Sequence, residues 1–413
     1  MVFSAFAFLL VPFTARAQTR QSIPADFKTL AAQAAAASEQ DRIEDAIALY
    51  TRALALRPKW AEGWWSLGTL RYDRSRYAQA AQDFEKVISL NPGNGTAHAM
   101  LGLCQFELGR DEAALKNLLE GQKLGVQEDQ QLRGVVLYHL GVLELRARKY
   151  NDARETLAQL VKVGVKTSEV ITALGMAALM MRPDEAPVEG SGRLMVVVQV
   201  GEAEALLQSK DYERAKRVYA ELASGFPDFP NLHFAYGRFL LELSETDNAV
   251  AQFQQEIQNS PGHVAARLEI AAVRYRLDSA DGVKYAEEAV KLDPRRPSGH
   301  YLLGLLYLDT QNFSGAISEL EIAKRSYANV PEVYFALGSA YAHMGRKAEA
   351  ARARAAFTRL NAQRKKESDG TVYDEHPRGL AQERLRAALV TISTAISPSG
   401  CTNGPERIVA DAN

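Results

Sequence analysis

The sequence predicts an all-α protein built as a solenoid of antiparallel helix pairs. Small residues that follow an apolar residue recur along the chain, most of them 33 or 34 residues apart, at Gly68, Gly102, Gly141, Gly175, Gly237, Ala271, Gly304 and Gly338. Prolines such as Pro58 and Pro92 keep the same spacing of 34 residues. Between these markers the apolar residues follow the period of one helix face. A packing unit must recur to bury its apolar face, whereas a catalytic constellation occurs once, so the pattern indicates repeats.

The stretch WWSLGTLRYDRSRYAQAAQDFEKVISLNPGNG, residues 64–95, shows what one unit contains. Trp64 and Leu67 mark the apolar face of a first helix, and Ala80 and Phe84 mark that of a second. The polar DRSRY turn lies between them, and NPGNG ends the second helix with Pro and Gly. We expect Gly68 to let the two backbones approach at Ala80, with large side chains filling the space beside them.

These residues resemble the tetratricopeptide repeat family, whose pattern is matched by Trp64, Leu67, Gly68, Tyr72, Ala80, Phe84 and Pro92. The resemblance implies a right-handed superhelix in which the first helices line a concave groove. It extends over about nine units, 27–60, 61–94, 95–128, 134–167, 196–229, 230–263, 264–296, 297–330 and 331–364, with a lone first helix starting at Ser168.

The N-terminal residues 1–17 are predicted to be a signal peptide. An apolar run from Val2 to Phe13 precedes Ala15-Arg16-Ala17, a small-x-small cleavage signal before Gln18. The expected location is therefore outside the cytoplasm, in a periplasm or secreted. The apolar run is shorter than a membrane span, and no later segment has the roughly 18 consecutive apolar residues that a spanning helix needs, so membrane insertion is not expected.

The rest of the chain is expected to form two blocks of repeats, 18–180 and 194–364. The segment MRPDEAPVEGSGR, residues 181–193, breaks the helical period with two Pro and two Gly and is interpreted as a linker or surface loop. A polar tail, 365–413, contains the helix-like stretch LAQERLRAALVTISTAI, which would cap the last unit.

No catalytic device is recognisable, so the chain is not expected to be an enzyme or to hold a cofactor. The P-loop, zinc-protease and nucleophile-elbow motifs are absent, and Gly190 and Gly192 precede the Val-rich run where a dinucleotide fingerprint needs them after it. The formal net charge of −1 gives no reason to expect nucleic acid as a partner. A small-molecule ligand is not expected either.

The seven histidines do not predict a metal site. His98, His233 and His300 all occupy the position that Trp64 fills in its own unit, so they are spread along the array and indicate packing. The sequence DEH at 374–376 places three potential ligands in a row, but consecutive side chains seldom point at one ion. Cys104 lies in an apolar helical pattern and is interpreted as a core residue, and Cys401 lies in the polar tail.

The functional hypothesis rests on the residue that follows the tryptophan position. In the resembled family this residue faces the groove, and here it is Trp65, Ala99, Tyr138, Thr172, Val200, Phe234, Leu268, Tyr301 and Phe335. The predicted partner-binding residues are Trp65, Tyr138, Phe234, Leu268, Tyr301 and Phe335. The alternative is that these side chains are wedges between neighbouring first helices. A second surface feature is the basic stripe of Arg352, Arg359 and Lys366, which indicates either an acidic partner or a solvated helix face.

The predicted function is a scaffold that binds a protein or peptide outside the cytoplasm. The alternative is a regulatory or accessory subunit of an envelope enzyme that handles polysaccharide or glycan, with a site that no motif reveals. Some members of the resembled family clamp a C-terminal carboxylate with Lys, Asn and Arg. The equivalent positions here hold Ala31, Ala35, Ser66 and Met100, so that clamp is absent.

Overall fold

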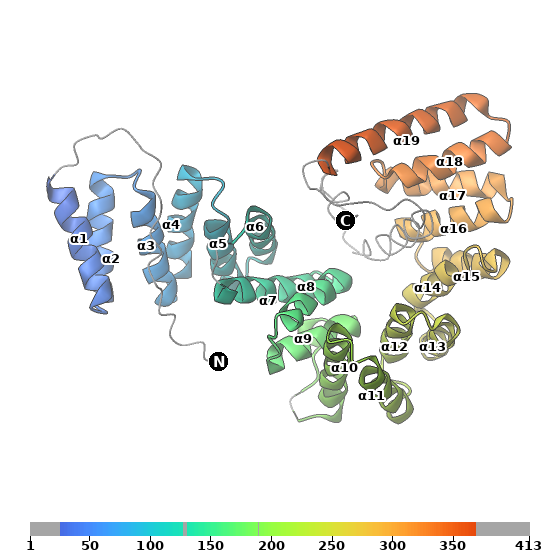
Figure 1. The fold of residues 1–413 in the computed structure, drawn as a ribbon, viewed down its shortest axis with the longest axis horizontal. Coiled ribbons are helices and arrows are strands. Elements are labelled where there is room, and N and C mark those ends of the chain that lie inside the picture. Colours follow the sequence, from blue (N-terminus) through green and yellow to red (C-terminus); the bar gives the residue numbers. More distant parts are fainter. Residues whose placement is uncertain (1–24, 127–129, 189, 369–413) are drawn as a thin grey trace. The chain divides into compact units, whose positions relative to one another are not determined.

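The computed structural model describes residues 25–126, 130–188 and 190–368, and within them every regular element is a helix (Figure 1). The prediction of an all-α solenoid is confirmed. The predicted signal peptide, 1–17, and the predicted capping stretch in the tail lie outside the described residues. The last helix ends at Ser368, beyond the predicted end of the array at Arg364.

The chain divides into two compact units between residues 128 and 129. The first unit contains three helix pairs, α1 (Ala25–Glu39) with α2 (Ile43–Leu56), α3 (Ala61–Asp73) with α4 (Tyr77–Leu90) and α5 (Gly95–Glu107) with α6 (Asp111–Leu124). These pairs agree with the first three predicted repeats, because each Pro-containing segment ends one second helix and begins the next first helix.

The second unit contains all the remaining described helices. They are α7 (Gln130–Arg146), α8 (Tyr150–Lys162), α9 (Ser168–Ala178), the short 3₁₀ helix η1 (Pro183–Glu185), α10 (Gly192–Gln208), α11 (Tyr212–Gly225), α12 (Leu232–Glu242), α13 (Thr246–Asn259), α14 (Val264–Arg274), α15 (Ser279–Leu292), α16 (Pro297–Asp309), α17 (Phe313–Ser326), α18 (Pro331–His343) and α19 (Lys347–Ser368).

In five helix pairs the glycine of the first helix receives a large side chain from the second helix. A Cβ atom added at Gly102 would lie 2.8 Å from Cγ of Leu118, and one at Gly304 would lie 2.6 Å from Cγ of Leu320. The side chains that fill this position are fully buried, namely Phe84, Leu118, Leu157, Phe253 and Leu320. The glycines therefore make room for these large side chains, and at Gly68 the nearest side chains are those of Phe84 and Asp83, not that of Ala80 as predicted.

The turns between paired helices share a left-handed residue that the sequence pattern did not reveal. The φ angle is +67° at Gly109 and +70° at Gly345, where glycine carries no strain. Ser75, Lys210 and Gln311 adopt φ between +58° and +62° at the same place in other turns. The turns thus share one geometry although most of their left-handed residues are not glycine.

The predicted division at 181–193 is not where the structure divides. That segment lies inside the second unit, because α9 and α10 on its two sides pack directly against each other. A Cβ atom added at Gly175 would lie 1.9 Å from the carbonyl oxygen of Val197, and one at Gly201 would lie 1.9 Å from that of Ile171. The two helices are therefore antiparallel, with backbone against backbone at the two glycines, and the lone first helix has a partner.

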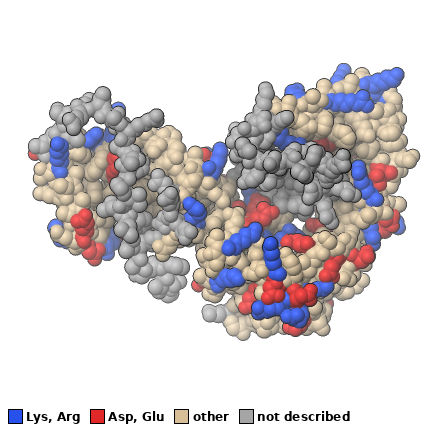
Figure 2. Space-filling view, viewed as in Figure 1, with Lys and Arg blue, Asp and Glu red and all other residues tan. Residues whose placement is uncertain are grey.

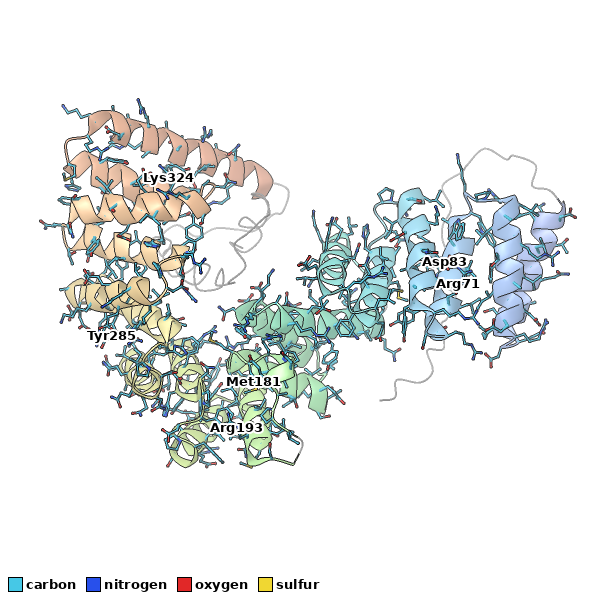
Figure 3. All side chains as sticks on the ribbon, turned by 180° about the vertical axis from the view of Figure 1, so that it is seen from behind. Arg71, Asp83, Met181, Arg193, Tyr285 and Lys324 are labelled. Carbon is cyan, nitrogen blue, oxygen red and sulfur yellow. The ribbon has the colours of Figure 1, made fainter. Side chains whose placement is uncertain are left out.

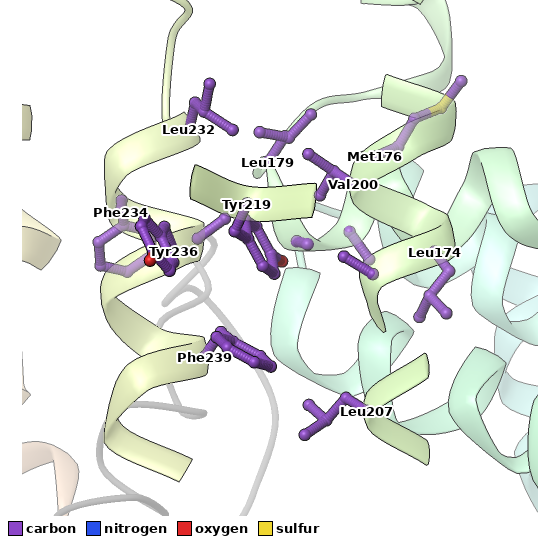
Figure 4. Packing of buried hydrophobic residues seen from close by; sticks show 14 of the residues in the cluster. Leu174, Met176, Leu179, Val200, Leu207, Tyr219, Leu232, Phe234, Tyr236 and Phe239 are labelled. Atoms are coloured by element: carbon purple, nitrogen blue, oxygen red, sulfur yellow. The ribbon is translucent and has the colours of Figure 1, made fainter. Parts of the chain in front are cut away.

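One continuous core covers this junction. Buried side chains of α9 and α10, including Leu174 and Val200, belong to the same cluster as Tyr219 of α11 and Phe239 of α12 (Figure 4). Tyr219 is fully buried, and its ring lies 5.2 Å from that of Phe239. Separating the chain at residue 193 would expose this cluster, which explains why the boundary lies elsewhere.

Candidate partner-binding surface

Three of the predicted groove residues are buried between helices. Phe234, Leu268 and Tyr301 are only 3%, 7% and 1% exposed. The ring of Phe234 lies 5.0 Å from that of His263, and the ring of Tyr301 lies 6.4 Å from that of Tyr327. Their burial argues against all three as exposed groove residues and agrees with the alternative that the pattern left open, in which these side chains are wedges.

The burial of Tyr301 could have been predicted from the composition of α16. A helix that is apolar on every face is buried on every face, and α16 reads PSGHYLLGLLYLD. Leu302 packs with residues of α14 and α15, whereas Leu305 packs with residues of α17 and α18. Neighbouring units therefore cover Tyr301 and its flanking leucines from both sides.

Two further predicted groove residues are partly buried. Trp65 of α3 lies edge-on to Phe84, with ring centroids 5.4 Å apart. Tyr138 of α7 lies 5.5 Å from the His139 ring, and burial raises the pKa of its hydroxyl. Both side chains keep some accessible surface, so each can still contribute to a contact with a partner.

Phe335 of α18 is the predicted groove residue that the structure leaves open. Its side chain is 64% exposed, in contrast to the 1% of Tyr301 one repeat earlier. The ring of Phe357 from α19 lies 5.4 Å away and is partly buried. Phe335 and Phe357 together form an exposed aromatic step at the end of the second unit.

Beside this aromatic step, the last repeat differs from the five helix pairs described above because no large buried side chain packs on its glycine. A Cβ atom added at Gly338 would meet Cγ of Arg354 at 3.5 Å, an ordinary contact. Arg354 is exposed, although its counterparts are the fully buried Phe or Leu of the earlier units. We call Phe335, Gly338, Arg354 and Phe357 the end face.

The helix that carries Arg354 and Phe357 also carries further basic residues. Lys and Arg atoms lie along α19 at the upper edge of Figure 2, and the exposed residues there include Arg352 and Arg359 of the predicted stripe. The side chain of Lys366, the third predicted member, lies outside the described residues. Arg364 is bound to Glu332 at 2.9 Å, whereas no described carboxylate pairs with Arg354. The end face therefore combines two aromatic rings with an available guanidinium.

A polar cluster inside the second unit was not visible in the sequence. Arg154 of α8 donates from Nε to Glu204 of α10 at 2.6 Å and also pairs with Glu242 of α12. The hydroxyl of Tyr219 donates to the other oxygen of Glu204 at 2.7 Å. Burial lowers the pKa of Arg154, but the attraction of its two carboxylate partners outweighs burial and raises the pKa overall, so this guanidinium stays charged. We call these contacts the α8–α12 bridge.

Arg238 of α12 reinforces the bridge by binding the side chain of Asn151 on α8. Its guanidinium also lies 6.0 Å above the ring of Phe234. In a regular solenoid each repeat touches only its neighbours. Here α8 contacts α12 directly, and the residues involved lie 87 and 88 positions apart. No local sequence pattern reports such a contact.

The histidines at the tryptophan position hold the preceding turn in place. Nε2 of His300 lies 2.9 Å from the carbonyl oxygen of Pro294, and Nε2 of His233 lies 3.0 Å from that of Pro227. Trp64 donates from Nε1 to the carbonyl oxygen of Pro58 at 2.8 Å in the same way. Within the described ranges, no group of three His, Cys, Asp or Glu side chains could hold a metal ion.

A fourth histidine joins three helix ends. Nδ1 of His263 accepts from the backbone N–H of Ala266 at the start of α14, so its Nε2 carries the proton that is donated to Asn231 at 2.9 Å. Asn231 in turn donates to the carbonyl oxygen of Leu179 at 2.8 Å. Burial lowers the pKa of His263 to about 4, which favours the neutral ring that this geometry needs.

Two buried acids between paired helices are also notable. Asp83 of α4 accepts two bonds of 2.8 Å from Arg71 of α3, and burial nevertheless raises its pKa to about 6 (Figure 3). Glu144 of α7 is 5% exposed, and one of its carboxylate oxygens has no hydrogen-bond partner. Burial raises the pKa of Glu144 to about 8, so it is protonated at neutral pH. Burial also raises the pKa of the Cys104 thiol to about 12, as expected for a core residue.

The chain belongs to the tetratricopeptide repeat family. Family models described as tetratricopeptide repeats match residues 31–94, 66–122, 135–163, 200–264, 271–331 and 305–361, which is more than half of the chain. Repeats of this family form protein-interaction scaffolds. No described helix is long and apolar enough to cross a bilayer.

Curated relatives share only parts of their length with this chain. The protein CTR9 homolog of Arabidopsis thaliana is 22% identical over 307 residues, which cover 73% of this chain and 26% of the relative. The human protein SGT1 homolog is 32% identical over 77 residues, which cover 19% of this chain and 21% of the relative.

Solved structures with similar folds include MamA and the tetratricopeptide repeat domain of P58(IPK). A crystal structure of MamA has a TM-score of 0.38 at 16% identity and covers 40% of this chain and 96% of its own. The P58(IPK) domain has a TM-score of 0.27 at 14% identity and covers 78% of this chain and 99% of its own.

Proposed function

We propose that this chain is a scaffold that binds a protein or peptide outside the cytoplasm, with the end face as a main contact. The observation that carries the proposal is the exposure of Phe335 at a position where Phe234, Leu268 and Tyr301 are buried. An exposed phenylalanine, a partly buried second ring and an available arginine have the composition of a binding hot spot, in which aromatic residues and Arg are enriched. The membership in a family of interaction repeats supports the same function.

The location is proposed from the N-terminal sequence alone. The apolar run from Val2 to Phe13 and the cleavage signal Ala15-Arg16-Ala17 have the form of a secretory signal. Fusing residues 1–30 to a reporter that is active only after export tests this proposal. Mass spectrometry of the mature protein should then find Gln18 as its first residue. Retention of the reporter in the cytoplasm would contradict the proposed location.

The binding function is tested by placing a photoreactive phenylalanine analogue at position 335 of the full chain. We expect crosslinked protein at this position after irradiation in the native envelope. Position 277 is a matched control, because Leu277 is 73% exposed but lies in the turn before α15. Equal capture at both positions would indicate unspecific contact and would argue against the end face as a binding surface.

A further inference from the structure

The end face has the geometry of a packing surface for one more first helix, and we call this surface the seat. In the preceding repeat, Tyr301 and Leu320 share a buried cluster with Val333 and Leu337 of the first helix that follows. Phe335 and Arg354 occupy the corresponding positions one repeat later, and they are exposed. The surface that α18 covers on one repeat is thus open on the last repeat among the described residues.

The chemistry of this seat differs from that of the earlier ones in one residue. Phe335 and Phe357 keep it aromatic, but Arg354 replaces a buried leucine or phenylalanine at its centre. A helix that packed here with only apolar residues would bury the guanidinium without a partner, which is strongly unfavourable. The occupant must therefore bring a carboxylate to Arg354 as well as apolar side chains to the two rings.

We propose that the end face binds a partner protein through an acidic amphipathic helix that continues the array as an added repeat. Its apolar stripe contacts Phe335 and Phe357, and an Asp or Glu within the stripe pairs with Arg354 in a charge-assisted contact. Arg352 and Arg359 are exposed on the same helix, but they lie two residues before and five residues after Arg354 and so project from another side of α19. This inference rests on the proposed scaffold function and names the partner chemistry.

The chain's own tail offers this chemistry only weakly in its helix-like stretch. The helix-like stretch 380–396 contains Arg384 and Arg386 but only one acid, Glu383, so its charge is positive. A helix of net positive charge is repelled by Arg354, whereas an acidic helix is attracted to it. Charge complementarity therefore favours a separate acidic partner over residues 380–396.

The test uses two synthetic 18-residue helical peptides as probes against the full chain. Both carry leucines with the spacing i, i+3, i+4, i+7, and their remaining positions hold Ala with either Glu or Lys. Fluorescence anisotropy should show that the Glu peptide binds at least tenfold more tightly than the Lys peptide. Arg354→Glu should reverse that preference, and Phe335→Ala should weaken binding of the Glu peptide about tenfold. Arg217→Glu, a charge reversal on α11, is the matched control and should change neither result.

Two outcomes would overturn the proposal. One is a missing charge effect at Arg354, seen either as equal binding of the two peptides to the wild-type chain or as an unchanged preference for the Glu peptide in the Arg354→Glu variant. The other is displacement of the Glu peptide by a synthetic peptide of residues 380–396 at equal or lower concentration, which would assign the seat to the chain's own tail. Specific crosslinking at position 335 with no charge preference would leave the scaffold function standing while removing the acidic helix.

Discussion

The α9–α10 junction and the α18–α19 pair depart from the regular repeat in opposite directions. At α9–α10 the two backbones touch, because Gly175 and Gly201 each face a carbonyl oxygen at a distance that excludes a Cβ atom. At α18–α19 the equivalent glycine, Gly338, has only ordinary contacts, and its neighbour Arg354 is exposed. The first site is closed in the middle of a core, and the second is open at the end of an array.

This difference teaches that one sequence feature can have two structural meanings. A glycine at the small-residue position marks either a place where packing excludes any side chain or a place that merely follows the family pattern. What separates the two cases is the residue opposite the glycine. Substitutions at matched positions of the two regions measure the difference directly.

The largest expected effect is at the closed junction. Gly201→Ala places a Cβ atom against the carbonyl oxygen of Ile171, so α9 and α10 must move apart, at a cost of about 3 kcal/mol or more in the free energy of unfolding. Gly338→Ala meets no such obstacle, and alanine favours a helix interior by about 1 kcal/mol over glycine. Urea denaturation of both variants checks this, and equal losses would show that the two glycines have the same role.

The second expected effect separates wedges from contact residues. Tyr301→Ala should lower the free energy of unfolding by about 3–5 kcal/mol, the usual cost of deleting a buried aromatic ring. Phe335→Ala should change it by only about 0.5 kcal/mol, as for other exposed positions, while it reduces crosslinking to a partner. Denaturation midpoints and capture measured on the same proteins test both. A large loss of stability in the Phe335 variant would argue that this ring is part of the core.

A third expected effect belongs to the α7–α8 pair of the second unit and depends on pH. The pKa of Glu144 is raised to about 8 in the folded chain, so the folded state binds this proton more tightly than the unfolded state does. Its contribution to stability is fully present below about pH 4.5 and is lost as the pH rises through 8. Glu144→Gln should therefore gain about 1–3 kcal/mol at pH 9 relative to wild type, with a smaller difference at pH 5.

Thermal unfolding of the Glu144→Gln variant and wild type at both pH values measures this effect. Asp83→Asn in the first unit is a useful comparison, because Asp83 has a bound arginine, whereas one carboxylate oxygen of Glu144 has no partner. A Glu144→Gln variant that follows the pH dependence of wild type would show that Glu144 does not titrate in this range.

The smallest expected effect on stability is at the open end. Arg354→Leu restores the apolar residue of the other repeats, and with no described helix following to cover it the free energy of unfolding should change by about 0.5 kcal/mol or less. The variant should instead self-associate, because the introduced leucine would join two aromatic rings into one apolar patch. Sedimentation velocity at several concentrations measures this. A variant that stays monomeric would indicate that the patch is already covered.

The sequence was sufficient for the fold because the repeat signal is local. Gly102 and Leu118, for example, lie within one helix pair, and their spacing recurs in unit after unit. The site was predicted less well, because burial at the position after the tryptophan depends on neighbouring repeats. Tyr301 and Phe335 follow the same pattern in the sequence, and only the helix after each decides that one is a wedge and the other is exposed.

The α8–α12 bridge could not be predicted for a different reason. Arg154 and Glu242 lie 88 positions apart, beyond the reach of any repeat pattern, and their residue types are ordinary for a helix surface. The segment 181–193 was interpreted as a linker or surface loop because Gly190 and Pro187 resemble linker residues, whereas the packing of Gly175 on Gly201 across it cannot be inferred from the spacing of apolar residues.

The bridge also has a consequence for how the second unit opens. An array with only nearest-neighbour contacts frays from its ends, one repeat at a time. Fraying that starts at α19 can proceed through α13 without breaking the bridge, but opening α12 separates Glu242 from Arg154 and leaves a buried charge without one of its partners. Helices α8 to α12 should therefore exchange their amide hydrogens as one cooperative block, slowly and together, while α13 to α19 exchange in a graded series towards the C-terminal end.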